Sequence, residues 1–220
     1  MFSKAGGENF IMKNKILSDE WCKSLKYVNQ LDYPDMSYPT RFDREDREYG
    51  KNTTVATSGC GLASSVMVAH YLLENCNFEI EDAVNLSIEN GANHGIGTDY
   101  KIYSKAFAQK MGITVESNRD IEHLKECIKN GSAAVVHCFK RPNDNYIPLF
   151  TKSGHYIALI GIAPDGRAVV LDPSYEKGKY DIEGRNGRAE VIEDKVVLCD
   201  FNDLARENCD IYIFTNNFQG

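Results

Sequence analysis

The sequence lacks several features that mark whole classes of protein. It has no basic excess, because 25 Lys and Arg residues stand against 32 Asp and Glu residues, for a net charge of −7. A nucleic-acid-binding surface is basic, so this charge argues against a nucleic-acid partner. No run approaches the roughly 20 apolar residues of a membrane span, and residues 1–15 contain no apolar signal-peptide core. We therefore expect a soluble protein with no membrane span, either cytoplasmic or exported without a recognisable signal peptide.

Paired cysteine motifs are also missing. The chain has seven cysteines, an odd number, and no two of them form a Cys-x-x-Cys pair. This pattern fits neither a disulfide framework nor a zinc ribbon, and it indicates a reducing compartment. The length of 220 residues suits one domain. We expect a flexible N-terminal arm over residues 1–20 and a single domain over residues 21–220, with no metal site. The sequence does not predict an oligomeric state.

The character of the chain changes near its middle. Helical patterns occupy the first half, over residues 57–73, 79–90, 101–111 and 119–129. Short β-branched or alternating runs follow, over residues 133–139, 155–162, 168–171, 191–198 and 211–214. Helices followed by strands predict an α+β fold, with a helical first half packed on an antiparallel sheet. Residues 38–52 are highly charged and read as an exposed loop, and residues 176–200 look like an insertion before the last strands.

The segment 57–73 carries the first candidate for chemistry. Its apolar residues recur at helical spacing, at Leu62, Val66, Ala69 and Leu73. Ser58 is a plausible N-cap, which puts Cys60 in the first turn of the helix. The helix dipole and the free N–H groups there favour a thiolate and lower the thiol pKa. Gly59 and Gly61 would leave the sulfur uncrowded. A lone cysteine in such a place is more often a buried core residue.

Two later residues favour a catalytic role for Cys60 over a purely structural one. Residues 155–162 and 168–171 flank Pro-Asp-Gly, which predicts a hairpin. His155 begins the first of these strands and Asp172 follows the second, so both lie at the same end of the hairpin. A carboxylate there can hold one imidazole nitrogen while the other faces a thiol. Together with Cys60, the pattern predicts a cysteine nucleophile.

Three segments carry a resemblance to a known family. They are TVATSGCGLASSVMVAHYL (54–72), FTKSGHYIALIGIAPDGRAVVLDPS (150–174) and YVNQLDYPD (27–35). They resemble the bacteriocin-processing peptidases and their relatives, the peptidase family C-thirty-nine-like proteins. The resemblance implies a papain-like cysteine peptidase fold, with Cys60 as nucleophile, His155 as general base and Asp172 as the orienting carboxylate. It also implies that the Gln30 amide and the Cys60 N–H form the oxyanion hole, that the substrate is a peptide or protein, and that no metal or organic cofactor is needed.

The sequence departs from the family pattern at some positions, and functions other than peptide cleavage are alternatives. Leu62 stands where the family usually has proline after Gly-Cys-Gly, and the stretch from Asp35 to Thr53 is longer than usual. The same three catalytic groups could instead deamidate a protein glutamine or transfer the acyl group to another acceptor. A non-catalytic binding module on the same fold is a further alternative.

Three other histidines have structural explanations that require no catalytic or metal-binding role. His70 lies on the apolar side of the helix and reads as a core histidine. His123 reads as an exposed helix position. His137 lies beside Cys138 on a strand pattern, where no further metal ligand is evident.

Overall fold

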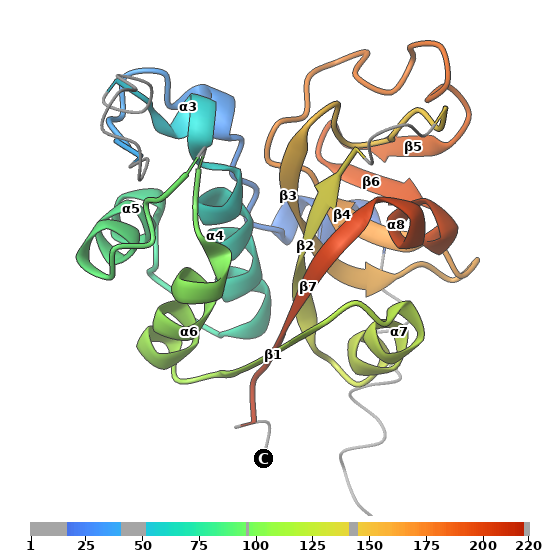
Figure 1. Ribbon diagram of the computed structural model, residues 1–220. Helices are drawn as coiled ribbons and strands as arrows, with labels where there is room; N and C mark the ends of the chain where they lie inside the picture. The colour runs from blue at the N-terminus through green and yellow to red at the C-terminus, as the bar shows by residue number, and fades with distance from the viewer. Residues whose placement is uncertain (1–16, 41–51, 96, 141–144, 218–220) are drawn as a thin grey trace, which may run out of the picture.

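An antiparallel sheet lies between two groups of helices, one on each of its faces (Figure 1). The computed structural model describes residues 17–40, 52–95, 97–140 and 145–217, without the side chain of Cys209. Most of the expected arm at residues 1–20 therefore lies outside the described residues. The part that is described includes the start of a helix at Asp19.

Within these described ranges the sheet contains seven strands in the order β1-β7-β2-β3-β4-β6-β5, and every neighbouring pair is antiparallel. The strands are β1 (Thr114–Asn118), β2 (Ala133–Phe139), β3 (Gly154–Ile162), β4 (Ala168–Leu171), β5 (Ala189–Ile192), β6 (Val196–Cys199) and β7 (Asn208–Thr215). Strands β3 and β4 form the hairpin that the Pro-Asp-Gly turn predicts.

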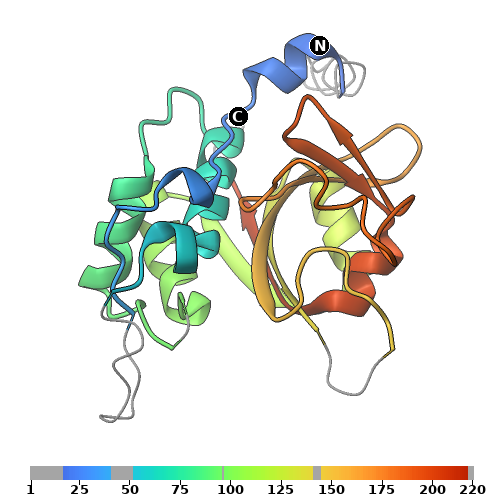
Figure 2. The ribbon, with the colours of Figure 1, turned by 90° about the horizontal axis from the view of Figure 1, so that it is seen from above.

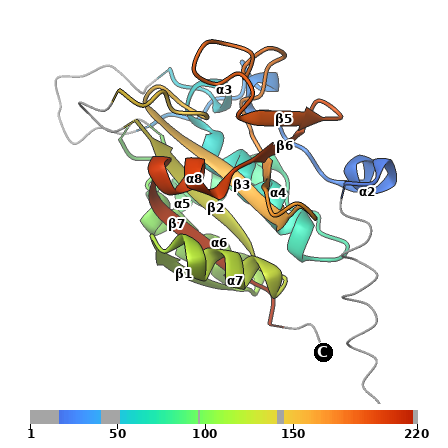
Figure 3. The same cartoon turned by 90° about the vertical axis from the view of Figure 1, so that its right-hand side faces the viewer.

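More helices pack on one face of the sheet than on the other. They are α2 (Asp19–Ser24), α3 (Val55–Ser58), α4 (Cys60–Leu72), α5 (Ile80–Glu89), α6 (Tyr100–Met111), α7 (Ile121–Lys129) and α8 (Phe201–Glu207), with a 3-10 turn η1 at Gln30–Asp32. The α4, α5 and α6 layer lies on one side of the sheet, as the view from above shows (Figure 2). Helices α7 and α8 cover the other face (Figure 3). The helix that begins at Cys60 therefore packs on the sheet, as the sequence predicts.

The alternation along β3 shows why the sheet has a core on each face. Ala158 and Ile160 belong to the core shared with α4, whereas Ile157 and Leu159 belong to the core shared with α7 and α8. All four side chains are fully buried. A strand with side chains alternating between two covered faces reads as a continuous apolar run, as HYIALIGI does.

One sequence expectation about the elements was wrong, and two elements were not predicted. Residues 191–198 form parts of two strands, β5 and β6, because the chain reverses at Glu193 and Asp194, which both have φ of 51°. The elements β1 and α8 were not predicted. β1 is a short polar edge strand paired only with β7, and α8 has only seven residues. Both derive their stability from tertiary packing more than from a strong local pattern.

The two charged stretches also differ from expectation. Residues 38–40 are not exposed: Tyr38 is fully buried, and its hydroxyl lies 2.7 Å from Ser87 Oγ and 2.8 Å from Thr98 Oγ1. The rest of that predicted loop, residues 41–51, lies outside the described residues. Residues 176–200 are not a simple insertion, because they include β5 and β6, which extend the sheet at the β4 edge.

Candidate active site

Cys60 is the first residue of α4, and it is half-buried. The N-cap is Gly59, not Ser58 as expected. A capping box between Thr54 and Thr57 starts a preceding helical turn, α3, which contains Ser58. Gly59 is required where the two helices join, because a Cβ there would lie 2.6 Å from the Val55 carbonyl oxygen. The glycine thus permits close packing of α3, and its expected role in keeping the sulfur uncrowded is not needed to explain it.

The first turn of α4 packs against aromatic rings. A Cβ at Gly61 would lie 3.1 Å from the Tyr100 ring and 3.3 Å from the Tyr156 ring. These two rings are stacked, with centroids 4.8 Å apart. Ser64 Oγ donates to the Tyr156 carbonyl at 3.3 Å, which ties α4 to β3. These contacts fix Cys60 relative to the strand that carries His155.

His155 and Asp172 meet at the open end of the β3–β4 hairpin. The His155 Nε2 lies 2.7 Å from Asp172 Oδ1. Asp172 is fully buried and His155 is 6% exposed. The imidazole of His155 also interacts electrostatically with the Cys60 thiol. The structure therefore brings together the thiol, the imidazole and the carboxylate that were singled out from the sequence.

Four further residues hold the Asp172 carboxylate and its backbone. Lys179 Nζ lies 2.6 Å from Oδ2, and the Tyr180 hydroxyl donates to the same oxygen. The Ser174 N–H donates to Oδ1 at 3.0 Å, and Tyr27 OH donates to the Asp172 carbonyl at 2.7 Å. A buried carboxylate without such partners would be strongly destabilising. This set of donors keeps it ionised and in one orientation.

Lys179 and Tyr180 were not predicted from the sequence as residues of the site. Their side chains reach Asp172 because the chain turns after Ser174, where Tyr175 N–H donates to the Asp172 carbonyl at 3.2 Å. No motif marks that turn. The only signal in the sequence is that Lys179 and Tyr180 follow Asp172 by seven and eight residues, which is close enough for a turn to bring them into contact with it. Ser174, in contrast, stands next to Asp172-Pro173 in the recognised motif, and its Oγ lies 3.1 Å from His155 Nε2.

Gln30 is held between the α3 segment and the Asp172 loop. Its backbone N–H donates to the Pro173 carbonyl at 2.7 Å, and its Nε2 donates to the Ala56 carbonyl at 2.7 Å. One amide hydrogen remains for another acceptor. The side chain is buried, and Oε1 has no hydrogen-bond partner among the residues that the structure describes. The structure thus lodges Gln30 between the segments that carry Asp172 and Cys60.

Electrostatics favour a charged Cys60–His155 pair. Burial alone would raise the pKa of the Cys60 thiol, but the hydrogen bond and charge of His155 lower that pKa below its ordinary value. The Tyr156 and Gly61 backbone N–H groups lower it further. Burial opposes the charge on His155, yet the charge and hydrogen bond of Asp172 raise its pKa to about 9. The pair titrates as a unit, so these directions describe its macroscopic steps.

The charge of Asp172 follows from the same contacts. Burial works to raise the pKa of the Asp172 carboxyl, but the positive charges of His155 and Lys179 hold it far below its usual range. Three of the other thiols behave differently, since burial raises the pKa of Cys22, Cys127 and Cys199. Cys60 is thus distinguished from these three cysteines by its electrostatic surroundings as well as its position.

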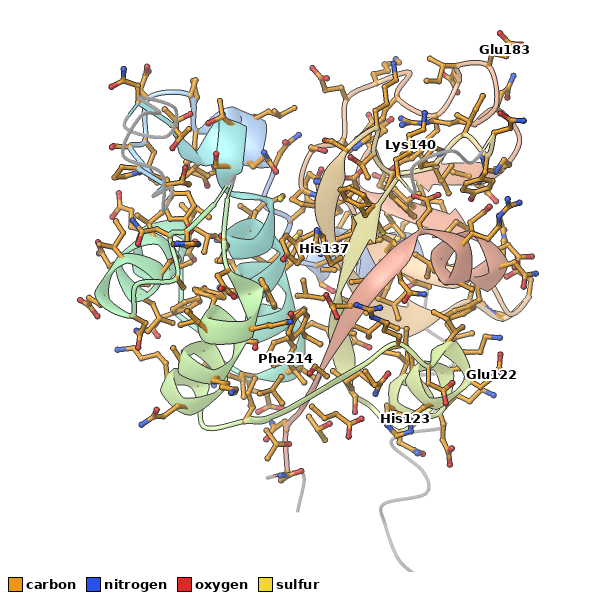
Figure 4. The ribbon with its side chains drawn as sticks, in the orientation of Figure 1. Glu122, His123, His137, Lys140, Glu183 and Phe214 are labelled. Carbon is orange, nitrogen blue, oxygen red and sulfur yellow. The ribbon has the colours of Figure 1, made fainter. Side chains whose placement is uncertain are left out.

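Three other histidines, His70, His123 and His137, make contacts of their own. His70 Nε2 lies 3.0 Å from the Phe78 carbonyl, and the residue is only partly buried, whereas the sequence predicted a core histidine. His137 stacks on Tyr156 with ring centroids 4.2 Å apart, and burial lowers its pKa. Figure 4 shows His137 between α4 and the sheet, far from His123 at the outer face of α7.

The sequence model of the Peptidase_C39 like family matches residues 23–191. The chain belongs to this family. The match includes Cys60, His155, Asp172 and Gln30, and it ends within β5. No match was found among the curated proteins.

Two solved structures are similar to this chain. One is a protein of Bacillus anthracis assigned to the C39-like peptidases, with a TM-score of 0.50 and 11% identity; the match covers 88% of this chain and 95% of that chain. Another is the peptidase domain of Streptococcus ComA, a bifunctional ABC transporter involved in quorum sensing, with a TM-score of 0.46 and 20% identity. That match covers 72% of this chain and 91% of the ComA domain.

Membership of the Peptidase_C39 like family agrees with the α+β, papain-like fold predicted from the sequence. It also supports a cysteine peptidase function, and with it a peptide or protein substrate. In the part of the chain that the structure describes, no helix has the length and apolar character to cross a membrane.

Proposed function

We propose that the protein is a cysteine peptidase that cleaves a peptide bond through a thioester acyl-enzyme. Cys60 is the nucleophile, His155 the general base and acid, and Asp172 the group that orients the imidazole. The observation that carries the proposal is the grouping of three residues: the Cys60 thiol interacts with the His155 imidazole, and His155 Nε2 lies 2.7 Å from Oδ1 of a fully buried Asp172. An activated thiol, a base within reach and a third group that fixes the base are the requirements of nucleophilic catalysis.

The first half of the reaction forms the acyl-enzyme. The Cys60 thiolate attacks the carbonyl carbon, and the carbonyl electrons move to the oxygen. The Cys60 N–H and the free amide hydrogen of Gln30 stabilise that oxyanion. The intermediate then collapses: the C–N bond breaks, and the departing amine takes the proton of the His155 imidazolium. A thioester and a neutral imidazole remain.

The second half uses water. Neutral His155 takes a proton from water as the oxygen attacks the thioester carbonyl. The second tetrahedral intermediate collapses with loss of the Cys60 thiolate, and the thiolate–imidazolium pair is restored. Throughout the cycle Asp172 stays ionised and keeps His155 Nε2 engaged, so that the other ring nitrogen faces the reacting atoms. None of these steps requires a metal or an organic cofactor.

Digestion of a mixture of synthetic peptides, followed by mass spectrometry, tests this proposal. We expect pairs of products whose masses sum to the substrate plus one water. Cys60→Ser should abolish them, and Cys76→Ser, at a half-buried cysteine outside the site, should not. Ammonia release with the peptide chain intact would instead identify a glutamine deamidase. Transfer of the acyl group to an added amine in preference to water would identify an acyltransferase. Absence of any Cys60-dependent chemistry would leave a binding module.

A further inference from the structure

A second group of reactive side chains lies on the opposite face of the sheet from α4. Glu116 on β1 and His123 and Cys127 on α7 bring one ligand atom each to within 4.8 Å of the others. His123 and Cys127 are four residues apart and share one face of α7. Glu116 comes from the neighbouring edge strand. In Figure 4, His123 and Glu122 lie at the outer face of α7, away from His137 and the centre of the molecule.

The distances within this group suit a small tetrahedral ion. Cys127 Sγ lies 3.5 Å from His123 Nε2 and 3.8 Å from Glu116 Oε1. With Zn–S of about 2.3 Å and Zn–N or Zn–O of about 2.0 Å, tetrahedral angles place sulfur about 3.5 Å from either lighter donor. His123 Nε2 and Glu116 Oε1 are hydrogen-bonded and closer than this geometry needs. Their side chains are 42% and 52% exposed, so the hydrogen bond can open without disturbing the core.

The surroundings add negative charge. The hollow beside His123 is lined by three acidic residues, Asp120, Glu122 and Glu126, and by Lys125 and Lys129. Lys125 is itself paired with Glu122 at 2.6 Å. A Glu–His ion pair alone would explain two members of the group. It does not explain why a free, half-buried thiol converges on the same two atoms.

We propose that Glu116, His123 and Cys127 form a zinc-binding site, with water as the fourth ligand. Carboxylate, imidazole and thiolate are the three ligand types that zinc takes in proteins, and three protein ligands leave one open position. The bound ion would join the edge strand β1 to α7. Because the triad reaction requires no metal, this site is separate from the proposed peptidase chemistry and would act on the stability of this layer.

The test measures zinc and cobalt binding to the Cys60→Ala protein. This background is necessary because Cys60 and His155 are themselves a thiol–imidazole pair that a zinc ion could bridge. Calorimetry should show one equivalent of zinc bound, with a rise in melting temperature. Cobalt should give the sulfur-to-metal charge-transfer band of a thiolate ligand. Adding Cys127→Ser should abolish that band and weaken binding about 100-fold or more, since loss of even an outer-shell partner costs about 10–100-fold.

The matched control is Cys76→Ser, which removes another half-buried free thiol and should leave binding unchanged. If the Cys127→Ser protein does not fold, Glu116→Gln at the exposed strand position takes its place, and it should weaken zinc binding at least about tenfold. Absence of zinc binding, or full binding retained in Cys127→Ser or Glu116→Gln, would overturn the proposal. None of these outcomes bears on Cys60 chemistry, so the two proposals fail separately.

Discussion

Lys179 offers a sharp test of how the buried carboxylate controls the site. Its Nζ lies 2.6 Å from Asp172 Oδ2, and the opposite oxygen, Oδ1, accepts from His155. The two cations share one carboxylate and are therefore about 5–6 Å apart. At an effective dielectric constant of about 20, their repulsion is about 3 kcal/mol. Lys179 thus acts as a positioning residue that also restrains the positive charge on His155.

Lys179→Met removes this cation and keeps most of the side-chain volume. The repulsion is lost, so the imidazolium is favoured and the pKa of His155 should rise. Three kcal/mol is an upper limit that corresponds to about two pKa units. The basic limb of the pH profile of kcat/KM, which is set by loss of the imidazolium, should therefore move upward by about one to two units. The profile is measured with a fluorogenic peptide identified in the digestion experiment.

The same variant should also be less stable. Removing one partner of a buried ion pair costs about 3–5 kcal/mol. The lower end applies here because Tyr180 and Ser174 still donate to the Asp172 carboxylate. Urea unfolding at neutral pH measures this loss, with Lys177→Met at an exposed neighbouring position as the control. Loss of stability with a basic limb that stays in place or moves downward would refute the electrostatic reasoning and leave Lys179 a purely structural role.

Two further substitutions address the other groups. Gln30→Ala should lower kcat about 100-fold or more with little change in KM, because an oxyanion donor acts mainly on the transition state; full activity in steady-state kinetics would remove Gln30 from the oxyanion hole. Asp172→Asn should lower kcat by about 10³–10⁴-fold. Lys179 and Tyr180 both need an acceptor, so the new amide turns its oxygen toward them and its NH2 toward His155 Nε2, which favours the wrong tautomer. A histidine NMR spectrum that keeps Nε2 protonated in this variant would contradict that account.

The central site was accessible from the sequence because its members lie at element boundaries. Cys60 precedes a segment whose apolar residues recur at helical spacing. His155 and Asp172 flank a hairpin whose turn has the sequence Pro-Asp-Gly. Local patterns of this kind fix which side chains share one end of a hairpin. The contact between α4 and β3 that joins the thiol to the imidazole is tertiary, and for that step the family resemblance supplied what periodicity could not.

What the sequence did not predict depends on long-range packing or on weak local signals. Lys179 and Tyr180 reach Asp172 only after the chain has turned back on itself, and an exposed lysine in a charged stretch reads the same in sequence as this buried one. Ser58 is a good capping residue by type, but the Thr54–Thr57 capping box starts helical structure earlier. The correct N-cap, Gly59, is chosen by its close approach to Val55.

The most direct measurement is the rate at which iodoacetamide alkylates Cys60 as a function of pH, resolved by peptide mass spectrometry against Cys76 in the same sample. The pKa of Cys60 is lowered by the His155 imidazolium, so alkylation should already be fast near pH 6.5, well below the pKa of about 8.5 of an ordinary thiol. His155→Ala should move the Cys60 profile to that of an ordinary thiol. If wild-type Cys60 instead follows the same pH profile as Cys76, and His155→Ala changes nothing, the thiolate–imidazolium pair does not exist and the peptidase mechanism is wrong.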